Sequence, residues 1–214
     1  MTLGFRYFRG PEADMSRLLP GLRVCSLCGQ TGRCFDLGFT LGTRLSEAEQ
    51  AGKAGCLECL RQDRFGFSHD TEVGFFTEEG FLPLYEPDTS PKQIFVVSGS
   101  GEAAKATAPL IYPPKPQVPE EAIAELKRTP EFLTFQDIPW PVHHNDFMAY
   151  LGIWGPEDVA ATSSPTTARD VFLEMVDRDD RTLWPEGKAP RFGNNLVAFQ
   201  CLHCQAYRGI LDFD

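Results

Sequence analysis

Four cysteines in the first third of the chain have the type and spacing of metal ligands. They form two CxxC steps, Cys25-Ser-Leu-Cys28 and Cys56-Leu-Glu-Cys59, with 27 residues between the steps. A CxxC step can present two thiolates to one ion, and two steps supply the four sulfurs of a tetrahedral zinc site. Two disulfides or four free thiols are the alternatives. We predict that Cys25, Cys28, Cys56 and Cys59 bind one structural zinc ion, because four thiolates leave no open position for a substrate.

The residues around these steps suggest how the chain closes on the ion. Gly29 follows the first step, where a glycine can adopt a left-handed turn. The second step opens residues 56–64, which have the pattern of a short helix, and a helix N-terminus favours a thiolate. This order of turn, hairpin and helix predicts a treble-clef-like zinc module. The remaining cysteine of this region, Cys34, is expected to be a buried thiol rather than a ligand.

A third CxxC step lies in the last 21 residues of the chain. Cys201-Leu-His-Cys204 is flanked by apolar, strand-forming stretches, which predicts a hairpin with the cysteines at its turn. The step has only two sulfurs of its own. A second zinc site is therefore possible with Cys201, Cys204 and His144 as ligands, and with water or His143 as the fourth ligand.

The segment His143-His144-Asn145-Asp146 permits two interpretations. A zinc ion held by three protein ligands and a water, with Asp146 or Glu157 nearby as a base, would be a hydrolytic centre. In the alternative, His143 and Asp146 only join the segment 140–151 to the C-terminal hairpin. The second interpretation is favoured, and no residue is assigned a catalytic role.

Composition predicts a folded protein of the cytosol. The 214 residues are 42% hydrophobic and 12% aromatic, which is enough for a packed core. The N-terminal residues 1–7 lack the apolar region of a secretory signal, and no apolar run approaches the length of a membrane span. Thiols stay reduced in the cytosol, so the seven cysteines favour metal over disulfides.

Charge is distributed unevenly along the chain. Residues 1–64 hold 9 Lys and Arg against 7 Asp and Glu, whereas residues 65–214 hold 11 against 23, a net charge of −12. Nucleic-acid binding depends on Lys and Arg contacts to phosphate, so we expect no nucleic-acid partner. A strongly acidic body would instead attract a basic protein. Charge that serves only solubility is the alternative.

These patterns predict an α+β protein with three regions that form one compact unit. The regions are a zinc module over residues 1–64, a variable β-rich and proline-rich connection over 65–118, and a helical body with a C-terminal β-hairpin over 119–214. Helices are expected over residues 119–130, 146–151 and 167–176. Residues 5–8 are expected to form an edge strand packed on the zinc module.

Several segments together resemble the CbrC family of bacterial proteins, although residues 65–118 match it poorly. The similar segments are Phe5-Arg-Tyr-Phe8, the first CxxC with Gly29, the second CxxC, Lys127-Arg-Thr-Pro130, Gln136, Trp140, His143, Asp146-Phe147, Leu151-Gly152 and Cys201-Leu-His-Cys204. The resemblance implies a link with tolerance to a DNase colicin. It implies no catalytic residues, since the family has little assigned biochemistry.

The chain departs from this family at one place. Relatives usually carry His-Cys-x-Asp-Phe-Cys, where this sequence has His-His-Asn-Asp-Phe-Met over residues 143–148. His144 and Met148 thus replace two cysteines that could complete a second four-sulfur site in the relatives. Methionine is a poor zinc ligand, so a second site here is either remodelled or empty.

The leading functional hypothesis is a cytosolic, zinc-containing, immunity-like protein that binds and neutralises a basic toxin, for example a nuclease. The first alternative is a metal-dependent hydrolase that uses an open second zinc site near His144, Cys201 and Cys204. A regulatory scaffold with a cellular partner is the second alternative. The absence of a convincing catalytic set in the sequence favours a binding protein over an enzyme.

Overall fold

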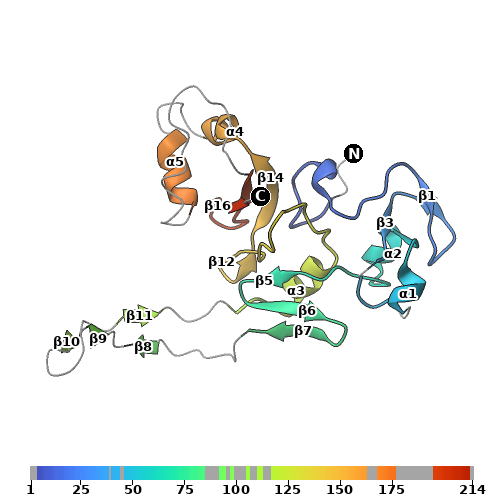
Figure 1. Cartoon of the computed structure of the whole chain (residues 1–214), viewed down its shortest axis with the longest axis horizontal. Helices are drawn as coiled ribbons and strands as arrows, with labels where there is room; N and C mark the ends of the chain where they lie inside the picture. The colour runs from blue at the N-terminus through green and yellow to red at the C-terminus, as the bar shows by residue number, and fades with distance from the viewer. Residues whose placement is uncertain are drawn as a thin grey trace.

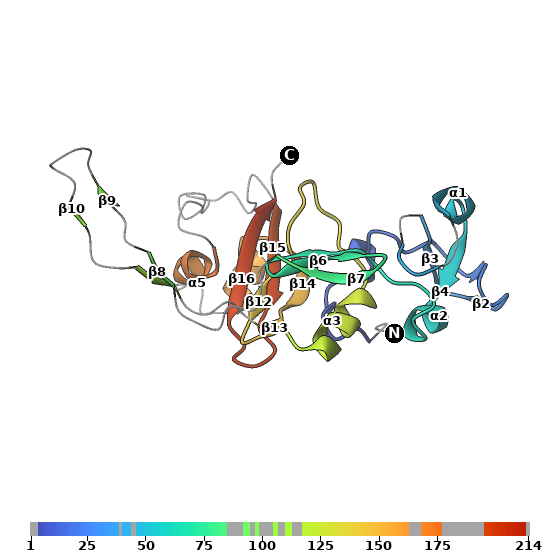
Figure 2. The same ribbon diagram turned by 90° about the horizontal axis from the view of Figure 1, so that it is seen from below.

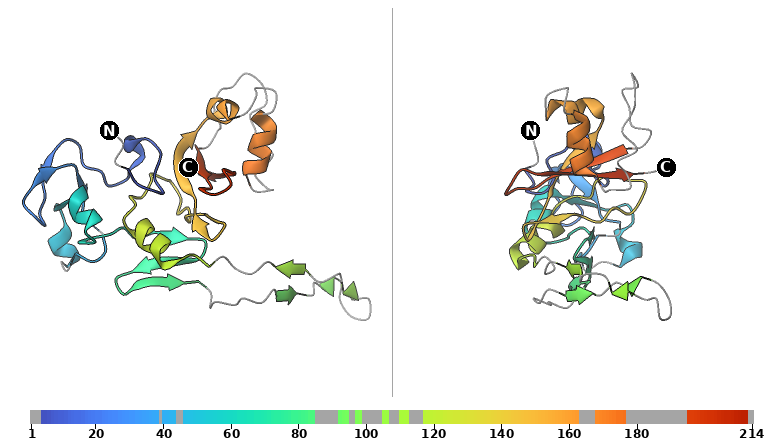
Figure 3. Two further views of the ribbon diagram at one scale, coloured as in Figure 1. Left: turned by 180° about the vertical axis from the view of Figure 1, so that it is seen from behind. Right: turned by 90° about the vertical axis from the view of Figure 1, so that its left-hand side faces the viewer.

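The computed structural model combines short helices with small antiparallel sheets, as the α+β prediction requires (Figure 1). It describes residues 4–38, 40–43, 46–84, 92–94, 97–98, 105–106, 110–112, 117–162, 168–176 and 195–212. Strand β1 and helices α1 and α2 lie at one end of the molecule, strands β8 to β11 lie at the other end, and helices α4 and α5 lie between them along the long axis (Figures 1 and 3).

The N-terminal region consists of very short elements that surround the first two CxxC steps. They are the 3-10 helix η1 (Glu12–Asp14), β1 (Arg23–Val24), β2 (Thr31–Gly32), β3 (Cys34–Asp36), α1 (Glu47–Gln50), β4 (Ala54–Cys56) and α2 (Leu57–Arg61). Strands β1 and β2 form one antiparallel pair, and β3 and β4 form another in which Cys34 lies opposite Cys56. Elements this short cannot be stable alone, so packing or a bound metal must hold them.

The middle of the chain forms a three-stranded sheet and an arm. The sheet consists of β5 (Asp70–Thr71), β6 (Gly74–Thr77) and β7 (Gly80–Pro83). Strand β8 (Lys92–Ile94) pairs with β11 (Leu110–Tyr112), and β9 (Val97–Ser98) pairs with β10 (Lys105–Ala106). These two pairs extend away from the rest of the chain (Figure 2).

The C-terminal region contains the longest strands. Its elements are α3 (Glu120–Lys127), β12 (Val142–His143), β13 (Asp146–Phe147), β14 (Ala149–Trp154), α4 (Pro156–Ala161), α5 (Ala168–Met175), β15 (Asn195–Gln200) and β16 (Tyr207–Asp212). Strands β14, β15 and β16 form one antiparallel sheet, which confirms the predicted hairpin. Helices α4 and α5 pack against this sheet around Val159, Phe172 and Leu196. Within the described residues, no helix has both the length and the apolar character needed to cross a membrane.

Two of the three predicted helices are confirmed, and the third is wrong. Helix α3 follows Pro119 and begins with two acidic residues, which suits the helix dipole. Helix α5 matches the third prediction, of which residue 167 lies outside the described residues. Most of residues 146–151 belong instead to β13 and β14, because Ala149–Trp154 pairs with β15 on both sides of a bulge at Leu151. A partner strand about 45 residues away overrides the local helical pattern.

Residues 5–8 do not form the predicted edge strand: Phe8 makes an isolated bridge to Tyr150, and the segment lies next to a different part of the chain from the one predicted. The backbone of Tyr7 and Arg9 exchanges hydrogen bonds of 2.8 Å with Tyr150 of β14, so this segment borders the C-terminal sheet. Phe5 retains the expected contact with the cysteine module, through an edge-on contact with Phe35. One buried cluster of side chains runs from Tyr7 through the module to Cys201, so the N- and C-terminal regions share a core.

His69 is a buried titratable residue inside this core. Its ring contacts Phe67, Phe76 and Trp140, and its Nε2 donates a 2.8 Å hydrogen bond to the carbonyl oxygen of Thr129. Burial in this apolar setting lowers the pKa of His69 below its ordinary value.

This burial predicts a pH dependence of stability. The unfolded chain takes up a proton at His69 below about pH 6.5, whereas the folded chain resists protonation until a lower pH. The contribution of His69 to the free energy of unfolding is therefore complete above about pH 6.5. It is lost as the pH falls toward the folded-state pKa, by up to about 1.4 kcal/mol per pH unit. Urea unfolding of the wild type and of His69→Gln, which keeps a donor but cannot titrate, should diverge in slope below this pH. Parallel pH profiles would contradict the assignment.

Candidate metal centres

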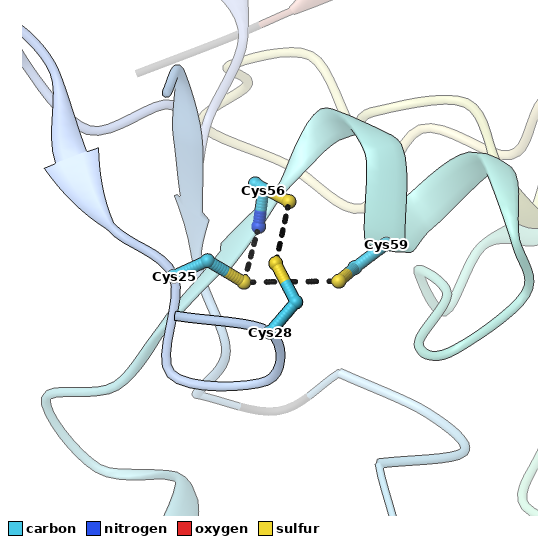
Figure 4. A group of neighbouring side chains, drawn as sticks. All are labelled: Cys25, Cys28, Cys56 and Cys59. Atoms are coloured by element: carbon cyan, nitrogen blue, oxygen red, sulfur yellow. Dashed lines mark hydrogen bonds between the residues drawn. The ribbon is translucent and has the colours of Figure 1, made fainter. Parts of the chain in front are cut away.

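The four cysteine sulfurs predicted to share an ion lie together in the structure. All four lie within 4.8 Å of one another, with 3.7 Å between the Sγ atoms of Cys25 and Cys59 and 3.6 Å between those of Cys28 and Cys56 (Figure 4). Sulfurs bound at ~2.3 Å to one tetrahedral zinc ion would be about 3.8 Å apart. Disulfide sulfurs would be only ~2.0 Å apart. The group therefore has the dimensions of a four-thiolate metal site and not those of disulfides.

Local backbone geometry places these sulfurs. Gly29 has the predicted left-handed conformation, with φ of 75°, and it allows the chain to turn back immediately after Cys28. Cys56 ends β4 and directly precedes α2, so Cys59 lies in the first turn of that helix. Three of the sulfurs come from buried residues, and Cys28 is exposed.

Hydrogen bonds direct positive charge and N–H groups toward the sulfurs. The Sγ atom of Cys25 accepts N–H bonds from Leu27 at 3.4 Å and from Cys56 at 3.2 Å (Figure 4). The guanidinium of Arg64 donates to Cys59 Sγ at 3.4 Å and also to the carbonyl oxygen of Leu27. Arg64 was not predicted as part of the site, because its only signal in the sequence is its position five residues after Cys59.

The ionisation of the four thiols is mutually constrained. Burial opposes the thiolate of Cys25, but the backbone N–H groups of Cys56 and Leu27 outweigh it and lower the pKa of Cys25 to about 6. Burial raises the pKa of Cys59 well above its ordinary range, and hydrogen bonds with the neighbouring thiols raise it further. Four thiolates this close repel one another, so full ionisation requires a cation at their centre.

Cys34 is a buried thiol, as predicted, and lies outside the four-sulfur group. Burial, reinforced by the nearby cysteine sulfurs, raises its pKa to about 11. Its Sγ lies 3.6 and 3.5 Å from the carbonyl oxygens of Arg23 and Gly32, where a protonated thiol can donate a weak hydrogen bond.

A second group joins the C-terminal CxxC step to the turn between β12 and β13. His143, His144, Cys201 and Cys204 have ligand atoms within 4.8 Å of one another. The Nδ1 atom of His144 lies 3.5 Å from Cys201 Sγ, and that of His143 lies 3.5 Å from Cys204 Sγ. The structure thus brings together the three predicted ligands His144, Cys201 and Cys204. It also places beside them His143, which was predicted as the alternative to water for the fourth ligand.

Asp146 connects the second group to the N-terminus. Its buried carboxylate accepts hydrogen bonds from Arg6, from the hydroxyl of Tyr7 and, at 2.9 Å, from Nε2 of His203. Burial and the bond to Asp146 raise the pKa of Tyr7 above its ordinary range. The predicted role of Asp146 in joining the segment 140–151 to the C-terminal hairpin is confirmed, and Arg6 and Tyr7 extend it.

Fold and site together define a mixed helix-and-sheet protein with two cysteine-containing groups that could each hold a metal ion. The chain belongs to UPF0167, described as an uncharacterised protein family, which it matches over residues 4–213. This membership is compatible with the resemblance to CbrC proteins, although the family description does not name them. No curated protein and no solved structure matches the chain.

Proposed function

We propose that this protein is a zinc-stabilised binding protein whose partner is a basic protein domain. Zinc at Cys25, Cys28, Cys56 and Cys59 would hold a module that resembles a treble clef, with its cysteine turn, the β3–β4 pair and the start of α2. A site with four thiolates has a structural role, because no coordination position remains for a substrate. The function then depends on a surface and not on this metal.

The observation that carries the proposal is an acidic pocket of about 280 Å³ between β5 and the segment 131–140. Its lining residues are Ser68, His69, Asp70, Glu131, Phe132, Thr134, Asp137, Ile138 and Trp140. Three of these residues are carboxylates, and none of the described lining residues is Lys or Arg. Glu131 is already paired with Arg17, whose Nε donates to it at 3.1 Å, so Asp70 and Asp137, which have no cationic partner among the described residues, supply the remaining charge.

The combination of aromatic walls and carboxylates suits the side chain of Lys or Arg. Phe132 is partly exposed and packs edge-on against the buried Trp140, with ring centroids 5.1 Å apart, so it offers an apolar surface against which a long aliphatic stem can lie. The exposed carboxylates would then pair with the charged end of the side chain. A buried Arg anchor surrounded by weaker contacts is a common arrangement at protein interfaces.

The segment beside the pocket has features of a protein-binding surface. Leu133 and Phe135 flank Thr134 and are 49% and 67% exposed, although both are apolar. The buried carboxylate of Asp212 accepts the backbone N–H groups of Phe135 and Gln136 at 2.8 and 2.9 Å and so holds this segment in place. These two exposed apolar side chains lie on a loop that is held in place beside the acidic pocket. This arrangement favours a protein partner over a free metabolite.

The resemblance to CbrC proteins suggests which basic partner to test first, namely a toxin domain such as a nuclease. An acidic surface would compete with nucleic acid for the toxin and thereby neutralise it. The hydrolase alternative requires a metal bound by His144, Cys201 and Cys204, with a water as its fourth ligand. The imidazole of His143 lies beside these three residues. We therefore propose binding and not hydrolysis.

The experiment is a binding assay against a panel of basic nuclease domains across a range of salt concentrations. The double variant Asp70→Asn/Asp137→Asn should weaken binding by about tenfold or more, because the partner's cation loses both exposed carboxylates. The matched control is Asp170→Asn/Glu174→Gln, which removes the same charge from exposed positions on α5 and should change affinity less than about threefold.

Two results would argue against the proposed function. Binding to no basic domain at low salt would remove the partner class. Equal losses in the pocket variant and in the α5 control would show that net charge, and not the pocket, attracts the partner.

A further inference from the structure

The two CxxC turns at opposite ends of the chain have the same backbone hydrogen bonds. In each turn, the N–H group of the first cysteine donates at 2.8 Å to the carbonyl oxygen five residues further on. Its own carbonyl oxygen accepts from the N–H group four residues further on, at 2.8 Å in the first turn and 3.2 Å in the second. Its sulfur accepts from the N–H group two residues further on, at 3.4 Å in both turns.

The second turn keeps this geometry although its sequence does not favour it. Gln205 has φ of 63° at the position that Gly29 occupies in the first turn, with φ of 75°. A residue with a side chain rarely adopts this conformation, and the cost must be offset by its surroundings. The C-terminal turn is therefore shaped like a metal-binding cysteine turn despite the lack of a glycine.

The two histidines that face the C-terminal cysteines also lie in a tight turn. His144 and Asn145 form the two-residue loop between β12 and β13, and both have positive φ, of 54° and 57°. Positive φ is uncommon for residues with a side chain, but Asn and His are among those that adopt it most often, so this tight turn forms without glycine. The tight turn brings the imidazoles of His143 and His144 side by side, with ring centroids 4.2 Å apart, and presents both to the cysteines.

We propose that His143, His144, Cys201 and Cys204 form a second, complete tetrahedral centre for zinc or a chemically similar divalent metal. A thiolate at ~2.3 Å and an imidazole nitrogen at ~2.0 Å from one tetrahedral ion lie about 3.5 Å apart. His144 Nδ1 and Cys201 Sγ are separated by 3.5 Å, and so are His143 Nδ1 and Cys204 Sγ. Two thiolates and two imidazoles suit zinc or cobalt, and they do not suit the hard cations magnesium and calcium.

The second centre differs from the first in accessibility. Three of its four ligand residues are exposed, whereas only one is exposed in the four-cysteine group. The metal joins two hairpin turns that the sequence places more than fifty residues apart, so it clamps the β12–β13 turn to the β15–β16 turn. We expect this ion to be released to chelators before the ion of the first centre. The inference does not depend on the proposed partner.

The test counts metal ions after incubation with excess zinc and removal of the unbound metal. The wild type should retain two ions per chain, one for each group of ligands. His144→Asn should retain one, because Asn preserves the left-handed turn but is a poor zinc ligand. His203→Gln is the matched control and should retain two, since His203 lies in the same cysteine turn but outside the ligand group.

Cobalt substitution provides a readout that does not depend on the count. In the wild type, the thiolate-to-cobalt absorption should contain contributions from both centres, and His144→Asn should lose only the contribution of the centre with two thiolates. Circular dichroism identifies any variant that fails to fold. In that case the wild type is tested instead, and the ion of the second centre should be released to a chelator before the ion of the first centre. A single ion in the folded wild type, or two ions in folded His144→Asn, would overturn the proposal.

Discussion

Replacing Cys59 with alanine is expected to abolish metal binding at the first centre and to unfold the N-terminal region. Binding of a structural zinc contributes about 10–16 kcal/mol of apparent free energy to small domains that fold around it. The strands of this region span only two or three residues each, so they depend on the metal and on the buried core shared with the C-terminal region, and the variant removes the first of these. For a chain of this length each kcal/mol lost lowers the Tm by about 2–4 °C, so the drop in a thermal melt should be large.

Cys34→Ala is the matched control for this experiment. Cys34 is also a buried cysteine of the same region, but it lies outside the four-sulfur group. Its replacement leaves a small cavity and should cost about 1 kcal/mol without loss of metal. Chelation of the wild type should lower the Tm at least as far as Cys59→Ala does, because it also removes the ion of the second centre. Equal metal content in the two variants would show that the four cysteines do not share an ion.

The second large effect is expected for Asp146→Ala. Removal of this buried carboxylate leaves the hydroxyl of Tyr7, the guanidinium of Arg6 and the Nε2 group of His203 without their common partner. The buried hydroxyl of Tyr7 then lacks its acceptor, which costs about 1–3 kcal/mol in the free energy of unfolding, whereas the side chains of Arg6 and His203 are about half exposed and can bond to water instead. Chemical denaturation at neutral pH measures this loss directly.

Two further variants separate the charge of Asp146 from its hydrogen bonds. Asp146→Asn keeps an oxygen acceptor for Tyr7 but loses the charge toward Arg6, so its loss of stability should be intermediate. In a double-mutant cycle, Tyr7→Phe combined with Asp146→Ala should cost less than the two single changes added together. Additive costs would show that the two side chains do not stabilise each other.

Contacts within a few residues explain what could be predicted from the sequence alone. The CxxC spacing, the left-handed Gly29, the start of α2 after Cys56 and the dipole pattern of α3 all depend on neighbours in the chain. The C-terminal hairpin could also be predicted from neighbouring residues, because its two strands are joined by a short turn. Local geometry alone was therefore enough to indicate a four-cysteine metal site and a C-terminal cysteine turn.

Contacts between distant residues decided the rest of the molecule. Residues 146–151 form strands because β14 pairs with β15, across a separation that no local pattern records. His143 lies 61 residues from Cys204, and Tyr7 lies 139 residues from Asp146, so neither pairing can be read from spacing. The pocket likewise combines residues 68–70 with residues 131–140. The sequence by itself determined which side chains could bind metal, and the tertiary structure alone decided which of them meet, because strand pairing and core packing are non-local.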